Sequence, residues 1–247
     1  MSMNVLQAVI LAIIQGIAEF LPISSSGHLV LAQKVMGLAT PPVAFDILLH
    51  VATLGAIFWF LGRKLKQSLR MWKLVIVGSI PAGVVGLLVQ PYLEDIFNSL
   101  AIVGVGLVVT GIVLLATKFK DKHQQLSYKT AVLIGMAQAV AILPGVSRSG
   151  STIATALWLG VGSQEALRFS LLLAVPAILG AQMLEIDKLL NNGTSLEINL
   201  IGFGVALVVG LAALKLLSKI LQHKKLHYFG WYCLAAGLVA LLVGSLK

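Results

Sequence analysis

The sequence predicts an all-α integral membrane protein with two inverted-topology repeats, each a re-entrant helix hairpin plus three transmembrane helices. Three observations predict this class. Hydrophobic residues make up 58% of the 247 residues and charged residues only 11%, whereas a soluble domain carries about 25% charged residues. The apolar segments are close to the roughly 20 residues that a helix needs to cross a bilayer. The same order of segments and polar landmarks then occurs twice.

The first half contains two apolar pieces too short to span a membrane and three that are long enough. A proline and a serine cluster separate the short pieces, and Thr40-Pro41-Pro42 ends the second of them. The long runs occupy residues 43–61, 74–90 and 99–117. Polar, irregular backbone at this depth is costly unless it is buried in protein or lines a wet cavity. We therefore expect the short pair to form a re-entrant hairpin.

The second half restarts this pattern, so that one membrane domain, 1–247, contains repeats at about 1–118 and 128–247. Short pieces at 130–143 and 147–160 precede long runs at 166–184, 198–217 and 228–246. Landmarks recur 123, 124 or 126 positions apart: Gln15 and Gln138, Ser24 and Ser147, Gly27 and Gly150, Phe45 and Phe169, Gly78 and Gly202, Gly104 and Gly230, and Gly111 and Gly237. The alternative is coincidence between leucine- and glycine-rich helices.

Charge placement predicts the orientation of the spans. If each half crosses three times, 14 of the 18 Lys and Arg residues fall on one face, in 62–73, in 118–129, at Arg168 and in 215–225. The positive-inside rule assigns this face to the cytoplasm. Both termini are then outside and the halves are inverted. The net charge of +9 thus reflects topology, and we expect no nucleic-acid partner.

Other classes lack support in the sequence. The lone Cys233 lies in an apolar segment and rules out a disulfide scaffold. No His, Cys and carboxylate cluster has zinc spacing, and no glycine-rich nucleotide loop occurs. Residues 5–14 lack the basic region and cleavage site of a signal peptide, so we expect them to belong to the mature fold.

The first polar interruption, residues 15–28, combines an amide, a carboxylate, three hydroxyls and an imidazole. Gln15 and Glu19 are four residues apart, which places both on one helix face. Ser24 to Gly27 suit the start of a second half-helix, where free N–H groups and the helix dipole favour an anion such as phosphate. His28 follows within one turn and can act as an acid or a base.

The second interruption, residues 138–152, repeats this arrangement with Arg148 in the place of Ser25. A guanidinium offers a forked donor that matches phosphate oxygens and stays charged. We expect the two interruptions to meet within the membrane and to form one site. Gln138 we interpret as a helix-packing amide.

Structural roles compete with these functional ones. Serine and glycine in apolar helices often serve only close packing, and Glu19 and Arg148 could form a structural ion pair. His28 could simply cap a helix or bond a carbonyl. Asp46 and His50 are ambiguous, because Asp46 suits an interfacial cap as well as a site.

At these residues the chain resembles the bacterial undecaprenyl-diphosphate phosphatase family, which is linked to bacitracin resistance. The resemblance covers essentially the whole chain and rests on Gln15-x-x-x-Glu19, Phe20-Leu-Pro-Ile-Ser-Ser-Ser-Gly-His28 and Pro144-Gly-Val-Ser-Arg-Ser-Gly-Ser-Thr152. It implies six spanning helices, two re-entrant pairs, and hydrolysis of undecaprenyl diphosphate to undecaprenyl phosphate and phosphate. The implied location is the outer face of the bacterial cytoplasmic membrane, where the reaction returns the carrier lipid for peptidoglycan synthesis.

The resemblance also implies roles for residues. The positions considered catalytic are Glu19, Ser25, His28 and Arg148. Substrate contacts are expected from Gln15, Ser24, Ser26, Ser147, Ser149 and Thr152. The family implies a divalent cation, Mg²⁺ or Ca²⁺. Gln15 stands where the family often has Glu, which weakens a charged metal ligand at that position and leaves Glu19 as the candidate.

The mechanism and the partners stay open at this stage. Either Ser25 or a water molecule could attack the phosphorus, and either Glu19 or His28 could act as base. The expected partners are a polyprenyl diphosphate and membrane lipid, with a homodimer as one option for the oligomeric state. The alternative function is a secondary transporter or lipid flippase, because inverted repeats with broken helices are the usual architecture of transporters.

Overall fold

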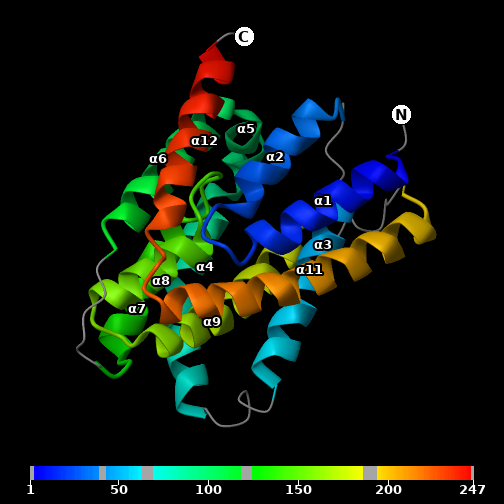
Figure 1. Cartoon of the computed structure of the whole chain (residues 1–247). Helices are drawn as coiled ribbons and strands as arrows, with labels where there is room; N and C mark the ends of the chain where they lie inside the picture. The colour runs from blue at the N-terminus through cyan, green and yellow to red at the C-terminus, as the bar shows by residue number, and fades with distance from the viewer. Residues whose placement is uncertain (1–2, 39–42, 63–68, 118–123, 186–193, 246–247) are drawn as a thin grey trace.

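The structure is a computed structural model that describes residues 3–38, 43–62, 69–117, 124–185 and 194–245 (Figure 1). Within these residues the chain is helical, apart from turns and an isolated bridge between Gln124 and Val161. Part of the sequence interpretation falls outside the described residues: Thr40, Pro41, Pro42, Arg63, Lys64, Lys66, Lys118, Lys120 and Lys122.

The first half forms the two expected short helices, followed by longer ones. Helix α1 spans Val5–Ala18 and α2 spans Ser25–Val35, and the longer helices are α3 (Val43–Leu61), α4 (Leu69–Val89) and α6 (Leu100–Leu115). A 3-10 turn, η2 (Gln90–Tyr92), and the short α5 (Leu93–Asn98) precede α6. These two were not predicted, because segments of three and six residues are too short to show an apolar periodicity.

The second half repeats this order. Helices α7 (Tyr128–Val140) and α8 (Arg148–Trp158) are short, and α9 (Ser163–Leu184), α11 (Leu196–Gln222) and α12 (Tyr228–Ser245) are long. The side chains of Ser127, Ser147 and Ser195 each accept a bond from the backbone N–H three residues later. These serines start α7, α8 and α11, because a hydroxyl at the N-cap satisfies an otherwise free donor.

Five of the six predicted spans, α3, α4, α9, α11 and α12, are long and apolar enough to cross a membrane. The remaining one, α6, has 16 residues, or about 24 Å at 1.5 Å per residue, against a hydrocarbon layer of about 30 Å. It is three residues shorter than the predicted run at 99–117, because Ser99 is its N-cap and the helix ends at Leu115.

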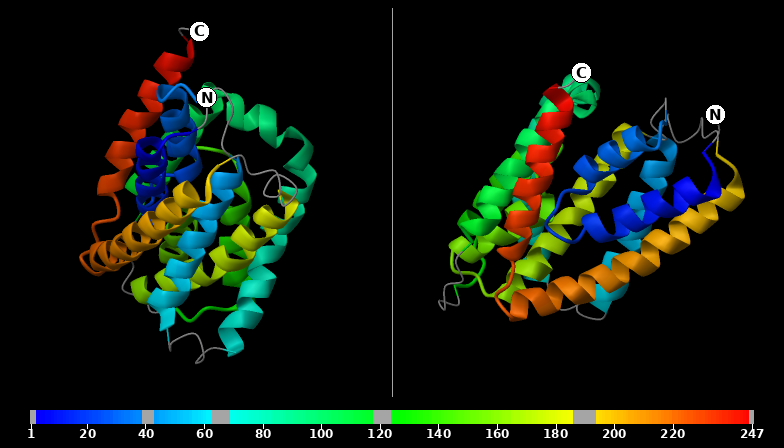
Figure 2. Two further views of the ribbon diagram at one scale, coloured as in Figure 1. Left: turned by 90° about the vertical axis from the view of Figure 1, so that its right-hand side faces the viewer. Right: turned by 45° about the horizontal axis from the view of Figure 1, so that its top comes forward.

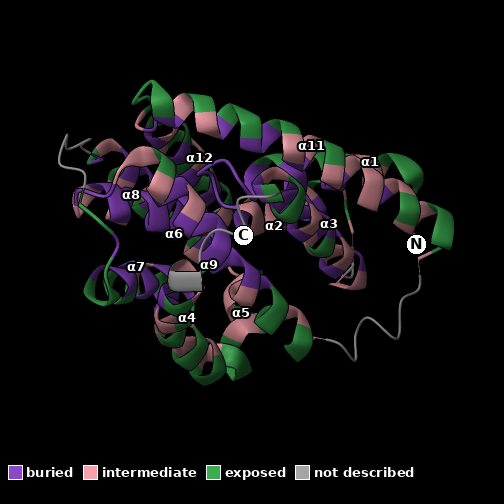
Figure 3. Cartoon of the chain, turned by 90° about the horizontal axis from the view of Figure 1, so that it is seen from below, coloured by how far each residue is buried: buried purple, intermediate pink, exposed green. Residues whose placement is uncertain are grey.

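The outer surface of the helices is apolar. Figure 3 shows exposed residues on the outward faces of α4, α11 and α12, and buried residues around α8 and α9. The exposed large side chains include Leu6, Trp59, Leu88, Leu200, Trp231 and Leu242. An apolar surface of this extent needs lipid and not water around it. The chain is therefore a multi-pass membrane protein.

Helices α6 and α12 pack along each other (Figure 2). A Cβ atom at Gly104 would lie 3.0 Å from the carbonyl oxygen of Gly237, and one at Gly111 would lie 2.9 Å from that of Gly230. Glycine allows this close approach of two backbones. Because the earlier glycine of α6 meets the later glycine of α12, the two helices are antiparallel.

Two buried phenylalanines lie against glycines of the opposite half. A Cβ atom at Gly202 in α11 would meet the ring of Phe45 in α3. One at Gly78 in α4 would lie 3.4 Å from the ring of Phe169 in α9. The first helix of each short pair also packs on the opposite half, α1 on α11 and α7 on α4. The first helix of each short pair is thus held against a long helix of the opposite half.

Candidate active site

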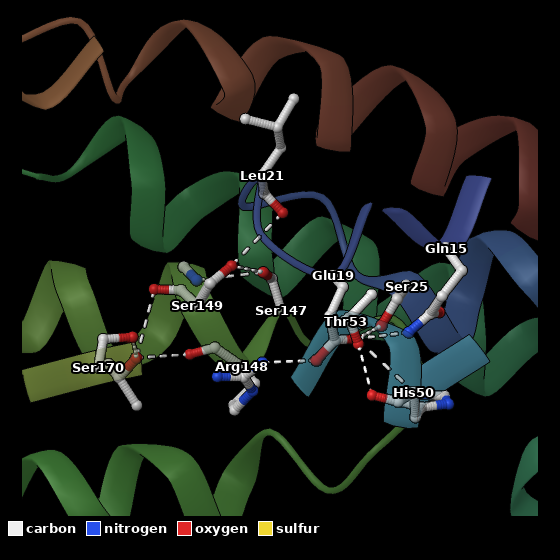
Figure 4. Close-up of polar contacts among 12 residues, drawn as sticks. Gln15, Glu19, Leu21, Ser25, His50, Thr53, Ser147, Arg148, Ser149 and Ser170 are labelled. Carbon is white, nitrogen blue, oxygen red and sulfur yellow. Dashed lines mark hydrogen bonds and ion pairs between the residues drawn. The ribbon is translucent and has the colours of Figure 1, made fainter. Parts of the chain in front are cut away.

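The two polar interruptions lie side by side at the centre of the helices. A Cβ atom at Gly27 would lie 3.2 Å from Cα of Gly145, and one at Gly150 would lie 3.2 Å from Cβ of Pro22. The hydroxyl of Ser149 donates to the carbonyl oxygen of Leu21 over 3.4 Å (Figure 4). The structure therefore brings together the two stretches that the sequence singled out.

The serines that start α2 and α8 form matching caps. Ser24 Oγ accepts from the N–H of Gly27 at 3.4 Å and lies 3.3 Å from Ser26 Oγ. Ser147 Oγ accepts from the N–H of Gly150 at 3.1 Å and lies 3.3 Å from Ser149 Oγ. Both half-helices therefore start at this site, where their remaining N–H groups favour an anion.

Ser24 has an unusual backbone conformation, with φ of 70°. Residues with a side chain rarely adopt this region, which costs about 1–2 kcal/mol. The second interruption uses Gly145 at φ of 88° instead, where glycine avoids the cost. Strained backbone often occurs at functional sites, where the surrounding structure holds it in place.

Glu19 is the centre of the polar contacts. Its side chain follows α1 and is 6% exposed. Oε2 accepts from Ser25 Oγ at 2.7 Å and from Gln15 Nε2 at 3.1 Å. Oε1 accepts from Arg148 Nη2 at 2.5 Å. Figure 4 shows Glu19 between Arg148 on one side and Ser25 and Gln15 on the other.

Arg148 bonds to Glu19 through one nitrogen only. Its second terminal nitrogen, Nη1, is buried and has no hydrogen-bond partner among the described residues. Oε1 of Gln15 is also buried without a partner there. Buried polar groups are normally bonded, so unpaired ones call for a water, an ion or a ligand. The ion pair with Glu19 is direct, as the structural alternative for these two residues expects.

The side chain of His28 points away from Glu19 and toward α12. Its Nδ1 lies 2.8 Å from the carbonyl oxygen of Ser24, so this nitrogen must carry the proton and donate. Its Nε2 lies 2.7 Å from the hydroxyl of Tyr232 on α12, and the two rings are stacked with centroids 5.6 Å apart. The ring nitrogens thus bond to Ser24 and Tyr232, and in this conformation neither is directed to Ser25 or Glu19.

His50 on α3 faces Glu19 instead. Its Nδ1 donates to the carbonyl oxygen of Asp46 over 2.8 Å, and its Nε2 lies 3.7 Å from Glu19 Oε2. Asp46 accepts from Gln33 Nε2 at 2.8 Å, which ties α2 to α3. The sequence left His50 ambiguous. The signal that could have identified it is an ionisable residue within a spanning segment, which is a functional candidate by default.

The hydroxyls of Thr152 and Thr110 form hydrogen bonds that hold the second interruption in place. Thr152 Oγ1 lies 2.6 Å from Ser170 Oγ on α9 and donates to the carbonyl oxygen of Arg148 at 2.8 Å. Thr110 Oγ1, on α6, donates to the carbonyl oxygen of Gly145 and accepts from the N–H of Ser147, each at 2.9 Å. Thr110 and Ser170 were missed because nothing in the local sequence marks them.

The site offers few ligands for a metal ion. Among the described residues no group of three or more His, Cys, Asp or Glu side chains could hold one. Mg²⁺ can nevertheless bind through one or two protein oxygens, several waters and the phosphates of a substrate. The unpaired Oε1 of Gln15 and the carboxylate of Glu19 fit such a partial site, so a cation fits here only together with a phosphorylated ligand.

Known proteins resemble the chain over nearly its whole length. The sequence profile of the family described as "Bacitracin resistance protein BacA" matches residues 8–239. A protein of Rhodopirellula baltica named undecaprenyl-diphosphatase is 42% identical over 97% of this chain and 98% of its own length. Proteins of the same name from Desulforapulum autotrophicum and Halothermothrix orenii are 37% and 38% identical, over 98% and 99% of this chain and 99% and 100% of their own lengths.

Proposed function

Because the chain belongs to the bacitracin resistance protein BacA family, we propose that it hydrolyses undecaprenyl diphosphate to undecaprenyl phosphate and inorganic phosphate. The observation that carries this proposal is the contact of Ser25 and Arg148 with the same buried carboxylate, Glu19. This contact brings together the hydroxyl, the carboxylate and the guanidinium that we propose as nucleophile, base and phosphate-binding group. The released monophosphate carrier becomes available for cell-wall synthesis, and its regeneration accounts for bacitracin resistance.

Ser25 is the proposed nucleophile and Glu19 its base. The 2.7 Å bond from Ser25 Oγ to Glu19 Oε2 is the geometry in which a base takes a proton. Oγ forms a bond to the terminal phosphorus while the bridging P–O bond breaks, and the lipid monophosphate leaves with the electron pair. Water then attacks the phosphoserine, and phosphate is released. Glu19 takes the proton from the serine and passes it to the departing monophosphate; in the second step it takes a proton from the water and returns one to Ser25 Oγ.

The remaining groups bind and orient the diphosphate. The guanidinium of Arg148 and the starts of α2 and α8 supply positive potential where negative charge accumulates, which is the main source of rate in phosphoryl transfer. The substrate contacts are Gln15, Ser24, Ser26, Ser147, Ser149 and Thr152. Thr152 acts through α8, since its hydroxyl is bonded to Ser170. A divalent cation held by Gln15 and Glu19 would neutralise part of the diphosphate charge.

The role of His28 differs from that of Glu19. Both ring nitrogens are engaged, one with Ser24 and the other with Tyr232. This favours Glu19 over His28 as the base for Ser25. His28 is proposed to assist the other oxygen, by giving a proton to the leaving oxygen or by taking one from the attacking water, which requires its ring to leave Tyr232.

The two halves are proposed to be inverted repeats with re-entrant hairpins. When a residue of one half contacts a residue of the other, the two counterparts of these residues are also in contact, as a two-fold axis requires. Gly27 meets Gly145 while its counterpart Gly150 meets Pro22, and 123 positions separate both pairs of counterparts. The antiparallel contact of α6 with α12, which hold equivalent places in the two halves, fits the same axis.

The site is proposed to open to the outer face of the cytoplasmic membrane. In Figure 1 the two termini lie toward the top, while the end of α3 and the start of α4 lie at the bottom. The described basic residues Lys219, Lys224 and Lys225 lie where α11 ends and α12 begins, toward the bottom of the same view. Basic ends are cytoplasmic by the positive-inside rule.

A phosphate-release assay tests the function. Purified protein in detergent is given a short polyprenyl diphosphate, and released phosphate is measured for wild type, Ser25→Ala and Arg148→Ala. We expect both variants to lose at least about a hundredfold in kcat, as removal of an electrostatic catalytic group usually does. Ser79→Ala, on α4, is the matched control. A phosphoenzyme trapped in Ser25→Ala would exclude Ser25 as the nucleophile.

Transport is the second candidate, because inverted repeats with broken helices favour it. A hydrolase releases phosphate in detergent, whereas a transporter requires two compartments. Wild-type protein that releases no phosphate in detergent, but moves lipid across a vesicle bilayer, would favour transport.

A further inference from the structure

Gln138 is a buried amide without a hydrogen-bond partner in the described part of the chain. It lies in the last turn of α7 and is 3% exposed. Neither its Nε2 nor its Oε1 bonds to any residue that the structure describes. A packing role explains why the side chain is buried but not why it is polar, because an apolar residue would fill the same space without an unpaired donor.

The repeat shows which partner is missing. Gln15 occupies the same place in α1, 123 positions earlier, and its Nε2 donates to Glu19. The residue that corresponds to Glu19 in the second half is Ile142. The side chain of Ile142 lies toward α4, where its Cδ1 is 3.8 Å from the Cβ position of Gly86. The second half therefore retains the amide but lacks the carboxylate that the amide bonds in the first half.

Arg148, the second donor residue of the second half, also has a nitrogen without a partner among the described residues. In the first half Ser25 and Gln15 both donate to Glu19 Oε2. Their counterparts in the second half are Arg148 and Gln138. Arg148 reaches Glu19 with Nη2 and leaves Nη1 buried without a partner within the described ranges. Both counterparts thus keep a donor for which the described residues offer no acceptor.

We propose that the missing acceptor in the second half is a phosphoryl group of the lipid diphosphate. It would occupy the position equivalent to that of the Glu19 carboxylate in the first half. Gln138 is then a substrate-binding residue, and its amide donates to a phosphate oxygen together with Nη1 of Arg148. This assignment rests on the proposed hydrolase function. The ligand supplies the negative charge that Ile142 does not. A neutral amide adds a bond without an additional positive charge that would retain the phosphate product.

Kinetics with Gln138→Leu test the assignment. We expect KM for a short polyprenyl diphosphate to rise about tenfold, which corresponds to about 1.4 kcal/mol, with a smaller change in kcat. The inhibition constant of inorganic phosphate should rise as well. The temperature of unfolding in detergent should not fall, since no bond within the protein is lost and an unpaired polar group is removed. Gln138→Glu should raise KM further, because two negative groups then meet.

Matched variants separate binding from structure. Gln182→Leu places the same substitution on α9, 12 residues beyond Ser170, or about 18 Å along the helix, and should leave KM unchanged. Gln138→Met, which is unbranched like glutamine, gives a second test if the leucine variant is not produced. An unchanged KM and phosphate inhibition in the Leu and Met variants would overturn the proposal. So would a lower unfolding temperature with unchanged KM, since the amide would then be structural.

The failure of this assignment can be told apart from a failure of the hydrolase function. If wild-type protein releases no phosphate, the hydrolase proposal fails. Binding of inorganic pyrophosphate to wild type and to Gln138→Leu, measured by calorimetry, then tests the amide by itself. Weaker binding to the variant supports the anion site, and equal binding refutes it.

Discussion

The pairing of Glu19 with Arg148 gives the sharpest prediction, because one contact has both a structural and a catalytic interpretation. Replacing Arg148 with Met removes the donor to Glu19 Oε1 and leaves a carboxylate that is 6% exposed. Two neutral donors, Gln15 and Ser25, remain on Oε2. Breaking a buried ion pair in this way costs about 3–5 kcal/mol. We expect a value near the lower end, because the donors to Oε2 stay in place.

The double variant measures the interaction itself. Glu19→Gln leaves the guanidinium unpaired and should also destabilise the protein, whereas Glu19→Gln with Arg148→Met leaves no buried charge of this pair. The double variant should therefore be more stable than the sum of the single effects predicts, by at least about 2 kcal/mol. The assay is the unfolding of the four proteins in detergent. For a chain of this size about 3–5 kcal/mol corresponds to about 6–20 °C in Tm.

Additive single effects would refute the reasoning, because they would mean that the two charges do not stabilise each other in the protein. Phosphate release from the same four proteins separates the two roles. A double variant that is stable but inactive shows that the charges are required for the reaction beyond their mutual pairing. A stable double variant with normal turnover would show that the pair is structural only.

Three further predictions concern neighbouring residues. Tyr232→Phe keeps the ring that stacks on His28 but removes its hydroxyl bond. We expect kcat to rise up to about fivefold, or about 1 kcal/mol, because the ring of His28 no longer has to break this bond to act, with Tyr228→Phe as an unaffected control. An unchanged or lower kcat would show that His28 does not have to leave Tyr232 in the reaction. His50→Ala should lower kcat/KM about fivefold, or about 1 kcal/mol, because Glu19 loses a neighbour at 3.7 Å. His50→Gln should restore part of the lost kcat/KM. Equal rates in wild type and both variants would show that His50 has no role in the site. Ser24→Ala should lower the free energy of unfolding by about 1 kcal/mol through the lost cap. Ser24→Gly should be more stable than Ser24→Ala, because glycine adopts φ of 70° without strain. Detergent melting curves that place the two variants in the opposite order would contradict the assigned strain.

The sequence predicted the helices well because their signals are local. The predicted run at 43–61 coincides with α3. Pro22 and Pro144 fall between two short helices, and each serine cluster lies at the start of the second short helix, where irregular backbone in lipid is kept short. The caps at Ser24 and Ser147 follow from residues adjacent to them. The length of α6 was overestimated by three residues, since hydropathy alone does not show that Ser99 is an N-cap or that the helix ends at Leu115.

The candidate site was predicted in part. Two landmark residues 129 positions apart, Glu19 and Arg148, are in contact, and the repeat offsets had indicated that their segments correspond. Residues outside the motifs could not be recovered in this way. Tyr232 and Thr110 lie in apolar spans whose sequence gives no sign that they face an interruption in the other half.

The sequence by itself determined the membrane class, the order of short and long helices, and the two interruptions that carry the polar groups. These properties depend on hydropathy, helix breaking and capping, which act over a few residues. Only the tertiary structure decided that His50 faces Glu19, that His28 bonds to Tyr232, and that Gln138 finds no hydrogen-bond partner among the described residues. Such choices depend on how helices far apart in the chain pack and on which rotamers that packing allows.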